Sequence, residues 1–525
     1  MTNKKKNFYI IILSILNVFR SFFLVSQALA SKKLIDVATT KSSKEDLIFW
    51  VIIFALLIIL NIVTSLLFLG IRNRFSLLVE VDMKNTIYQK LIKKDIEETR
   101  KIHSGEITNI YLSDIQNIRA GLCETIPNFF LYGSRFILSF IALIYFDYRL
   151  LIILLILGVF ALISAKIYSK IIKKYQKKSL ESDGKVNAFM QESFENIKIV
   201  KALSAEKNLC TSLDTKLDEN KNIKSKRNRI SLIGNGGVYV LMEITVAFTM
   251  IYGGISIYNG LLTYGSLVGL LQIVSYFETP LSMFSSLMTR FNAYKVSEER
   301  INNLYKIPDD YEQIKLNDFD KLVFNNVSFS YDQEILKDYN LTINKNDTIL
   351  LKGHSGCGKS TMFNLILGFI SPQNGSIDIY SNNNIYPSKQ CRELFSYVSQ
   401  ENILFSGTIE DNIKLFVPNY NEEDLINALK LACIYDEIME KPLKMKTIIN
   451  ERGNGLSLGQ IQRVLLAISI LQNKPILLLD EFTSALDKEL EKRIVINVSK
   501  LNKTKIIITH HDISLIEART IMLGD

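Results

Sequence analysis

Cysteine is scarce in this chain of 525 residues, which has five copies spread along its length. None of them forms a C-x-x-C pair, so the sequence indicates neither a disulfide framework nor a zinc site. Free thiols of this kind fit a reducing compartment. Tryptophan is scarcer still, because Trp50 is the only copy. It stands near the start of a long apolar run, where an indole is typical of a membrane–water interface.

Apolar sequence, by contrast, is abundant. Apolar residues make up 48% of the chain and the mean hydropathy is +0.16, which is high for a soluble protein. A helix of about 20 apolar residues crosses the roughly 30 Å hydrocarbon core of a bilayer. We therefore expect six transmembrane helices. They are predicted at residues 8–30, 47–70, 125–146, 150–165, 231–258 and 265–288.

The connections between these stretches alternate in length, and the two long ones follow the second and fourth stretches. Residues 166–230 carry about sixteen lysines and arginines against about eight acidic residues. By the positive-inside rule this loop is cytosolic, and the Lys4–Lys6 cluster lies on the same side. Helical spacing of apolar residues predicts long cytosolic helices with turns near 103–105 and 193–200. Because the basic charge already has this topological role, we expect no nucleic-acid partner.

Ionisable residues are few within the predicted spans. They are Arg20, Arg135, Glu243 and Glu278. Such groups are costly in hydrocarbon, so we expect them to face the bundle interior or a watery cavity, in either a substrate role or a structural one. Pro280 is predicted to kink the sixth span. The first stretch is too long for the core of a signal peptide, so we expect it to stay as a span.

The segment GHSGCGKST at residues 353–361 fits the G-x-x-x-x-G-K-[ST] phosphate-loop pattern. A strand-like run, 348–351, precedes it and a helix-like run, 362–368, follows it, as the pattern requires. In such a loop successive backbone N–H groups and the helix N-terminus bind phosphate oxygens. Lys359 is expected to reach the β- and γ-phosphates and Ser360 to ligate Mg²⁺. The expected nucleotide contacts are Gly353, Ser355, Gly356, Cys357, Gly358, Lys359, Ser360 and Thr361.

Other polar residues stand at the ends of apolar, strand-like runs or at the start of a helix. Gln400 is placed to orient water or to complete a metal shell, and Asp480 to hold Mg²⁺. Glu481 follows, where it can polarise an attacking water. Ser457, Gly459 and Gln460 open a helix and form a second phosphate-binding surface. Two more candidates are Tyr331 and His510, which end strand-like runs before and after the phosphate loop.

In this order the motifs resemble those of ATP-binding cassette (ABC) exporters of the half-transporter type, and the resemblance covers nearly the whole chain. It identifies 353–360 as Walker A, Gln400 as the Q-loop, 456–460 as the signature and 484–487 as the D-loop. It further implies Walker B at Asp480, the catalytic glutamate at Glu481, the switch histidine at His510 and adenine stacking by Tyr331. Glu451 resembles a loop that contacts membrane helices. The segments near Gly105 and 197–200 resemble coupling helices.

The implied fold is a membrane α-helical bundle with an α/β P-loop ATPase domain. We expect the transmembrane domain at 1–304, a linker at 305–320 and the ATPase domain at 321–525. The chain departs from the family at Leu458, where the signature usually has glycine, and it ends soon after His510, so some dimer contacts are in doubt. We expect no peptidase domain, of the kind that some peptide exporters carry, ahead of the first span.

The resemblance implies an ATP hydrolase that uses ATP and Mg²⁺ to export cargo from the cytosol by alternating access. We expect a dimer, of two identical copies or with a related half-transporter, in a bacterial inner membrane with the N-terminus and the ATPase in the cytosol. A peptide is the favoured cargo, with lipid or drug export as alternatives. A regulatory ATPase or an ATP-gated pore is an alternative of another class, whereas the spans argue against a soluble cassette and the fusion against an importer.

Overall fold

The computed structural model describes residues 2–40, 43–100, 107, 110–331, 333–354, 356–401, 403–450, 455–509 and 517–523. The side chains of residues 157–170, 173, 180, 235, 238 and 285 lie outside this description. The chain divides into two compact units. The first comprises Met1–Lys90 and His103–Lys306, and the second comprises Leu91–Ile102 and Ile307–Asp525.

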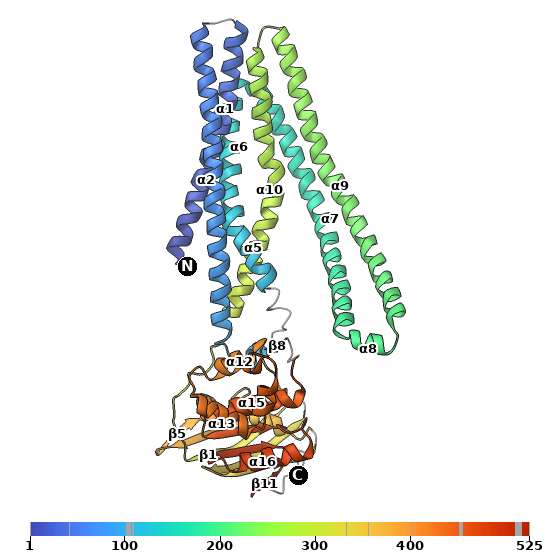
Figure 1. Ribbon diagram of the computed structural model, residues 1–525. Helices are drawn as coiled ribbons and strands as arrows, with labels where there is room; N and C mark the ends of the chain where they lie inside the picture. The colour runs from blue at the N-terminus through green and yellow to red at the C-terminus, as the bar shows by residue number, and fades with distance from the viewer. Residues whose placement is uncertain are drawn as a thin grey trace. The chain divides into compact units, whose positions relative to one another are not determined.

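The first unit is built from long helices (Figure 1). They are α1 (Asn3–Thr40), α2 (Lys44–Leu91), η1 (Ile110–Asp114), α5 (Ile115–Ala120), η2 (Gly121–Thr125), α6 (Ile126–Phe146), α7 (Tyr148–Glu195), α8 (Ile197–Ala202), α9 (Glu206–Tyr258) and α10 (Tyr264–Tyr305). Five helices in the described part of the chain are long and apolar enough to cross a membrane, and η1 to α6 count as one of them. The stretch expected as the fourth span forms the first part of α7.

The helices extend beyond the apolar stretches that predict them. Between the first two spans the expected loop at 31–46 is much shorter, because α1 continues to Thr40 and α2 begins at Lys44. On the other side α2 continues to Leu91, which confirms the predicted helical extension. The short helix α8 lies where a turn was expected near 193–200, whereas the turn expected near 103–105 falls outside the described residues. Pro280 lies inside α10, which runs past it as one helix.

The helices α1, α6 and α10 pack around a shared apolar core. It includes Val25 and Ala28 of α1, Leu143 of α6, and Leu270 and Phe277 of α10. Polar contacts also join α1 to α6, which fixes how the two helices lie along each other. The Asn17 amide donates to the Pro127 carbonyl at 2.9 Å, and the Ser21 hydroxyl donates to the Leu131 carbonyl at 2.8 Å.

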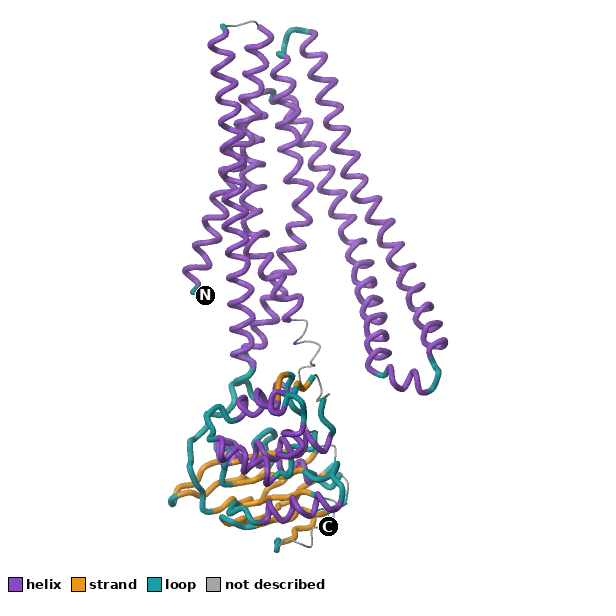
Figure 2. Tube along the Cα trace, viewed as in Figure 1, coloured by secondary structure: helices purple, strands orange, loops and turns teal. Residues whose placement is uncertain are grey.

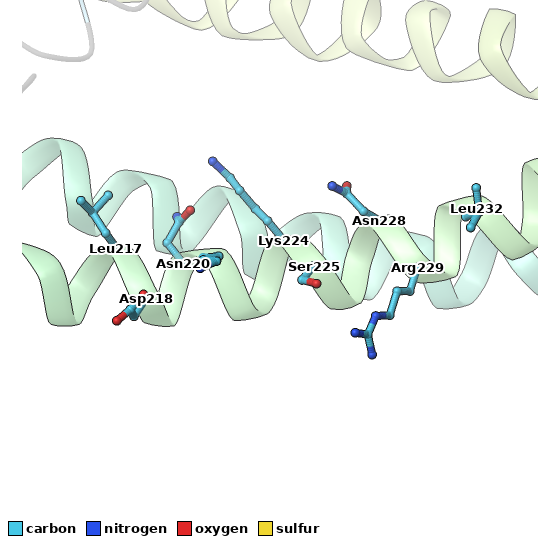
Figure 3. Close-up of a pocket in the computed structure, with 9 residues that line it drawn as sticks. Leu217, Asp218, Asn220, Lys224, Ser225, Asn228, Arg229 and Leu232 are labelled. Atoms are coloured by element: carbon cyan, nitrogen blue, oxygen red, sulfur yellow. The ribbon is translucent and has the colours of Figure 1, made fainter.

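The helices α7 and α9 form a long hairpin closed by α8, as the tube in Figure 2 shows. Along the parts of α7 and α9 that extend beyond the predicted spans, their contact is polar. Asn220 donates to the Ser182 hydroxyl at 3.1 Å and to Asp183 Oδ1 at 2.9 Å, and Lys224 lies 2.6 Å from the same carboxylate. A shallow hollow follows this stretch of α9 and is lined with basic and amide side chains, Lys224, Asn228 and Arg229 among them (Figure 3).

The second unit contains a five-stranded parallel sheet in the order β11-β3-β10-β9-β6 and a four-stranded antiparallel sheet in the order β2-β1-β4-β5. The strands are β1 (Lys321–Ser330), β2 (Glu334–Asn344), β3 (Thr348–Lys352), β4 (Asn374–Ser381), β5 (Asn384–Pro387), β6 (Phe395–Val398), β9 (Ile476–Asp480), β10 (Thr504–Ile508) and β11 (Arg519–Met522). The small pair β7 (Gly407–Thr408) and β8 (Ile448–Ile449) stands apart. Residues 322–324 and 327–330 lie in the single strand β1, which carries a bulge near Asn326.

Side chains on the parallel sheet alternate between two apolar cores, because successive residues of a strand point to opposite faces. Leu478 and Ile506 join the core that holds the helix α11 (Lys359–Ile366) between the two sheets. Leu477 and Ile507 join the core on the other face. That face is covered by α12 (Ile409–Phe416), α13 (Glu422–Leu431), α14 (Tyr435–Glu440), α15 (Leu458–Leu471) and α16 (Lys488–Ser499). The sheet therefore holds its carboxyl edge fixed between two packed layers.

The residues that follow α2 belong to the second unit, together with the short helix α3 (Ile96–Arg100). The Asp95 N–H donates to the Pro308 carbonyl at 3.0 Å, and the Asp310 N–H donates to the Lys93 carbonyl at 2.8 Å. Lys94 Nζ lies 2.7 Å from Asp309 Oδ1. Residues 307–310 therefore bind the segment after α2 to the second unit through both backbone and side chains.

Candidate nucleotide-binding site

The phosphate loop follows β3 and leads directly into α11, which begins at Lys359 and not at Met362 as expected. Gly356 and Gly358 have φ values of 86° and 96°, in the left-handed region that favours glycine. A Cβ on Gly358 would lie 2.1 Å from Cγ2 of Ile335, so no side chain fits there without a shift of its neighbour. These glycines let the loop curl tightly before the helix.

Lys359 lies at the centre of the curled loop and is 7% exposed. Its ammonium donates to the carbonyls of Gly353 at 3.0 Å and His354 at 2.9 Å, and it lies 3.8 Å from Sγ of Cys357. Cys357 is buried, and Thr361 is buried in the first turn of α11. The loop is therefore folded around a single positive charge, which suits a phosphate ligand.

The Asp480 carboxyl ends β9 next to this loop and is 2% exposed. It accepts a hydrogen bond from the Ser360 side chain, while its Oδ1 atom has no hydrogen-bond partner among the described residues. Burial raises the pKa of Asp480 to about 6; the Glu481 carboxylate adds to this effect, and the Ser360 hydrogen bond and the Lys359 charge oppose it. A hydroxyl beside a carboxylate with an unused oxygen fits Mg²⁺, which prefers oxygen ligands.

Glu481 follows β9 with a φ of 46°, an uncommon conformation for a residue other than glycine. Its N–H donates to the Ile508 carbonyl of the neighbouring strand at 2.9 Å. The Gln400 side chain, which follows β6, donates from Nε2 to Oε2 of Glu481 at 3.0 Å. The structure therefore brings Gln400, Asp480 and Glu481 together at one edge of the sheet, as their places at strand ends predict.

The predicted signature opens α15, with Ser457 as the N-cap. The Ser457 hydroxyl accepts from the Gln460 N–H at 3.2 Å, and the Gln460 side chain accepts from the Ser457 N–H at 3.1 Å. This capping box fixes both residues at a helix N-terminus. A Cβ on Gly459 would lie 2.9 Å from the Ala485 carbonyl, whereas Leu458 is 56% exposed. The glycine is therefore needed for close packing, and the leucine stands on the surface.

The sequence does not predict two sets of contacts around the signature, one made by Gln462 and the other by Glu437. Gln462 is fully buried and joins the signature helix to residues 484–485, since it donates to the Ser484 hydroxyl at 2.9 Å and accepts from the Ala485 N–H at 3.2 Å. Glu437 of α14 accepts from Arg463 at 2.5 and 3.0 Å and from Gln460 at 3.0 Å. In the sequence, the only sign that Gln462 and Arg463 make such contacts is that they are polar residues within an otherwise apolar helix.

Tyr331 lies just past β1 and is 59% exposed, with its ring edge-to-face on Phe329 at 4.9 Å between centroids. It is therefore accessible for stacking. His510, Ser355 and Glu451 fall outside the described residues. In the described part of this unit, no hydrogen bond joins the signature residues Ser457 and Gln460 to the phosphate loop.

A glycine loop between a parallel strand and a helix, with a buried aspartate at the end of β9 in the same sheet, defines this unit as a P-loop nucleotide-binding domain. In the same chain it follows a bundle of helices long enough to span a membrane. The chain belongs to the ABC transporter family: the model of the ABC transporter transmembrane region matches residues 10–281, and the ABC transporter model matches residues 336–484. With both regions fused, the chain is a half-transporter of the ABC exporter type.

Several relatives are similar over much of the chain. The lactococcin-A transport/processing ATP-binding protein LcnC of Lactococcus lactis is 28% identical over 416 residues, which is 78% of this chain and 58% of the relative. ComA, a transport/processing ATP-binding protein of Streptococcus pneumoniae, is 27% identical over 425 residues, which is again 78% of this chain and 58% of the relative. The chain thus spans less than two thirds of these two relatives. A Rickettsia conorii protein named "Putative export ATP-binding/permease protein" is 29% identical over 99% of this chain and 92% of the relative.

Among solved structures, that of a bacterial Atm1-family ABC exporter with ATP bound matches with a TM-score of 0.83. The match covers 99% of this chain and 93% of that chain at 21% sequence identity. It confirms the fold expected from the sequence, a helical membrane region followed by an ABC ATPase domain.

Proposed function

We propose that this protein is an ATP-driven exporter that works as a dimer and hydrolyses ATP between its two copies. The main support is the separation of two phosphate-binding surfaces within one chain. The phosphate loop surrounds Lys359, the signature caps α15 at Ser457, and no described hydrogen bond joins them. Each surface is formed without the other, so a second copy that faces the first completes both sites by symmetry.

In each site the residues have distinct tasks. Lys359 and the backbone of residues 353–361 bind the phosphates, and the exposed ring of Tyr331 stacks on adenine. Ser457, Gly459 and Gln460 of the second copy close over the γ-phosphate. Ser360, Asp480 and Gln400 would hold Mg²⁺, which would neutralise phosphate charge.

Hydrolysis uses the residues at the carboxyl edge of the sheet. Glu481 polarises the attacking water and Gln400 holds its carboxylate in place through the 3.0 Å hydrogen bond. His510 contacts the γ-phosphate, as the family resemblance implies. Closure of the two ATPase units on ATP and their release after hydrolysis then alternate the access of the membrane helices.

We propose a peptide as the cargo, carried outward across a bacterial inner membrane. The support is the likeness to LcnC and ComA, two proteins named for transport and processing. The basic extensions of α7 and α9 support the orientation with the ATPase in the cytosol. Lipid or drug export by the same machinery is the alternative.

The test uses the purified chain in proteoliposomes with the ATPase units outside. ATP hydrolysis is measured together with ATP-dependent accumulation of three labelled probes: a mixed pool of peptides, a phospholipid and a cationic dye. Accumulation of peptides is expected. Accumulation of the lipid or the dye instead would assign the alternative cargo, ATP hydrolysis without accumulation would favour a regulator or a pore, and no hydrolysis would overturn the proposal.

A further inference from the structure

Arg20 lies in the first predicted span and contacts neutral groups. Its Nη1 donates to Oδ1 of Asn17 at 2.9 Å and its Nε donates to the Ser65 hydroxyl at 3.0 Å. Its guanidinium lies 5.2 Å from the centre of the Phe68 ring. The Asn17 amide is fixed in turn, because its Nδ2 donates to the Pro127 carbonyl at 2.9 Å. Arg20 is therefore positioned by neighbouring helices, but its charge is not neutralised by them.

Arg135 lies in the third predicted span and has fewer partners still. Its Nε atom is buried and has no hydrogen-bond partner among the described residues. Its described contact is with the Tyr132 ring, at 5.9 Å from the centroid. Arg135 lies one helical turn from Leu131 and one from Ser139, both buried, so it lies on the inward face of α6. As a whole the side chain is half-buried, so part of it stays accessible.

The two arginines are close together. The Ser21 hydroxyl of α1 donates to the Leu131 carbonyl of α6 at 2.8 Å. Arg20 precedes Ser21, and Arg135 is four residues, or about 6 Å, beyond Leu131. The contact between Ser21 and Leu131 therefore places both arginines along the same stretch of the packing between α1 and α6. One anionic group between α1 and α6 can therefore lie near both guanidinium groups.

No carboxylate in the described part of the chain lies within ion-pair distance of either arginine. Glu243 and Glu278, the acidic residues of the predicted spans, lie on α9 and α10 and form no ion pair with them. Arg135 is ten residues into its predicted span, at a depth of roughly 15 Å in a core about 30 Å thick. Arg20 lies nearer one end of the spans, because its partner Ser65 is five residues from the end of the second predicted span. Both lie within the predicted spans, where an unneutralised cation is costly.

We infer that Arg20 and Arg135 form a cargo site for an anionic group, a carboxylate or a phosphate, between α1 and α6. The planar guanidinium binds both groups through paired hydrogen bonds, and burial strengthens such bonds. The inference rests on the proposed export function. It narrows the cargo to an anionic amphiphile, either a peptide with a free carboxylate or a lipid with a phosphate.

The test compares matched probes on the full chain in phosphatidylcholine proteoliposomes. One pair is a dodecanoyl tetrapeptide of alanine and leucine with a free C-terminal carboxylate and the same peptide as its amide. The other pair is dioctanoyl phosphatidic acid and dioctanoylglycerol. The readout is the probe concentration that gives a half-maximal change in ATP hydrolysis. In one pair the anionic member should act at about tenfold lower concentration than its neutral twin, as a charge-assisted hydrogen bond predicts. If the peptide pair shows this difference, the anionic group is a peptide carboxylate; if the lipid pair shows it, the anionic group is a lipid phosphate.

Arg135→Met and Arg20→Met should each remove this preference for the anionic probe, and Arg149→Met, at an exposed position, should keep it. Because Arg135 keeps an unpaired charge, Arg135→Met should not lower the melting temperature. Arg20→Met also loses the hydrogen bonds to Asn17 and Ser65, so its melting temperature is not used as a criterion. Equal action of the twins in both pairs would overturn the inference. A melting temperature of Arg135→Met lowered by more than about 5 °C would also overturn it, since it would assign Arg135 to a structural ion pair, for example with a second copy. Loss of all ATP hydrolysis in the parent chain would instead count against the proposed function itself.

Discussion

The Nε2 atom of Gln400 donates a 3.0 Å hydrogen bond to Oε2 of Glu481, although the two residues are far apart in the sequence. They follow the neighbouring parallel strands β6 and β9, whose register pairs Val398 with Leu479. Because parallel neighbours end at the same edge of a sheet, the two side chains meet there. The contact joins the proposed metal shell to the proposed catalytic carboxylate.

Glu481→Gln should reduce steady ATP hydrolysis by about 100-fold or more, because the amide keeps the shape but loses the charge that polarises water. ATP binding should stay within about threefold of the parent, since the phosphate loop around Lys359 is unchanged. Phosphate release and equilibrium ATP binding measure the two effects. The matched control is Glu423→Gln, an exposed position on α13, which should hydrolyse ATP at the parent rate. Parent-like hydrolysis by Glu481→Gln would contradict the proposed role.

The sequence was sufficient for those parts of the site that depend on local pattern. The phosphate loop needs glycines at fixed spacing between a strand and a helix, and these are visible in the residues themselves. The meeting of Gln400 with Glu481 was also predictable, because strand ends share an edge. The helix α11 begins three residues earlier than expected, because the glycine at 358 already supplies the turn.

Contacts between distant segments were not predictable in the same way. Glu437 and Arg463 pair across two helices, and no spacing rule relates a residue of α14 to one of α15. For a similar reason the sequence did not predict that the segment after α2 belongs to the second unit. Its helical spacing suggested one long helix, but α2 ends at Leu91, and the Lys94 contact with Asp309 joins the next residues to the second unit.

Leu458→Gly should lower the KM for ATP by about two- to fivefold, an effect of less than ~1 kcal/mol. The leucine is 56% exposed at the start of α15, where the second copy is proposed to meet the nucleotide, so its removal allows closer approach. The substitution also weakens the helix by up to about 1 kcal/mol. Leu415→Gly on α12, at an equally exposed leucine, controls for that loss and should leave the KM unchanged. A higher KM in Leu458→Gly would show that the leucine favours the closed state.

Lys503→Met should raise the melting temperature at pH 7. The Lys503 Nζ atom is buried with no hydrogen-bond partner among the described residues, and burial lowers the pKa of this lysine to about 8. Below pH 8 the folded chain therefore holds a charged ammonium at a cost in free energy. Between pH 8 and the ordinary lysine pKa near 10.5 the unfolded chain binds more protons, so the stability of the parent rises with pH. The advantage of the variant should shrink over that window.

Differential scanning at pH 7 and pH 9.5 measures this difference, with Lys500→Met at an exposed position as the control. The control should show no shift at either pH. A melting temperature below that of the parent at pH 7 would mean that the Lys503 charge is stabilised in the folded chain.

Glu437 determines the orientation of the signature through Gln460. Its carboxylate accepts from Nε2 of Gln460 at 3.0 Å and from both terminal nitrogens of Arg463. The hydrogen bonds from Arg463, the largest cause, lower the pKa of Glu437, so it is ionised at neutral pH. A carboxylate only accepts, so the Gln460 amide must turn its nitrogen to Glu437 and its oxygen to the Ser457 N–H. The capping box at the signature therefore depends on a charge on another helix.

Glu437→Gln should raise the KM for ATP by about tenfold, because the new amide also offers a donor to Gln460 and so permits the flipped orientation that breaks the capping box. Glu437→Asp keeps the charge and should recover most of this loss. ADP binding, which needs the phosphate loop alone, should stay unchanged in both variants, and this separates a role in positioning the signature from a general loss of stability. Glu440→Gln, at an exposed position on the same helix, should behave as the parent. An unchanged KM in Glu437→Gln, or an equal loss of ADP binding, would show that the contact between Glu437 and Gln460 does not position the signature.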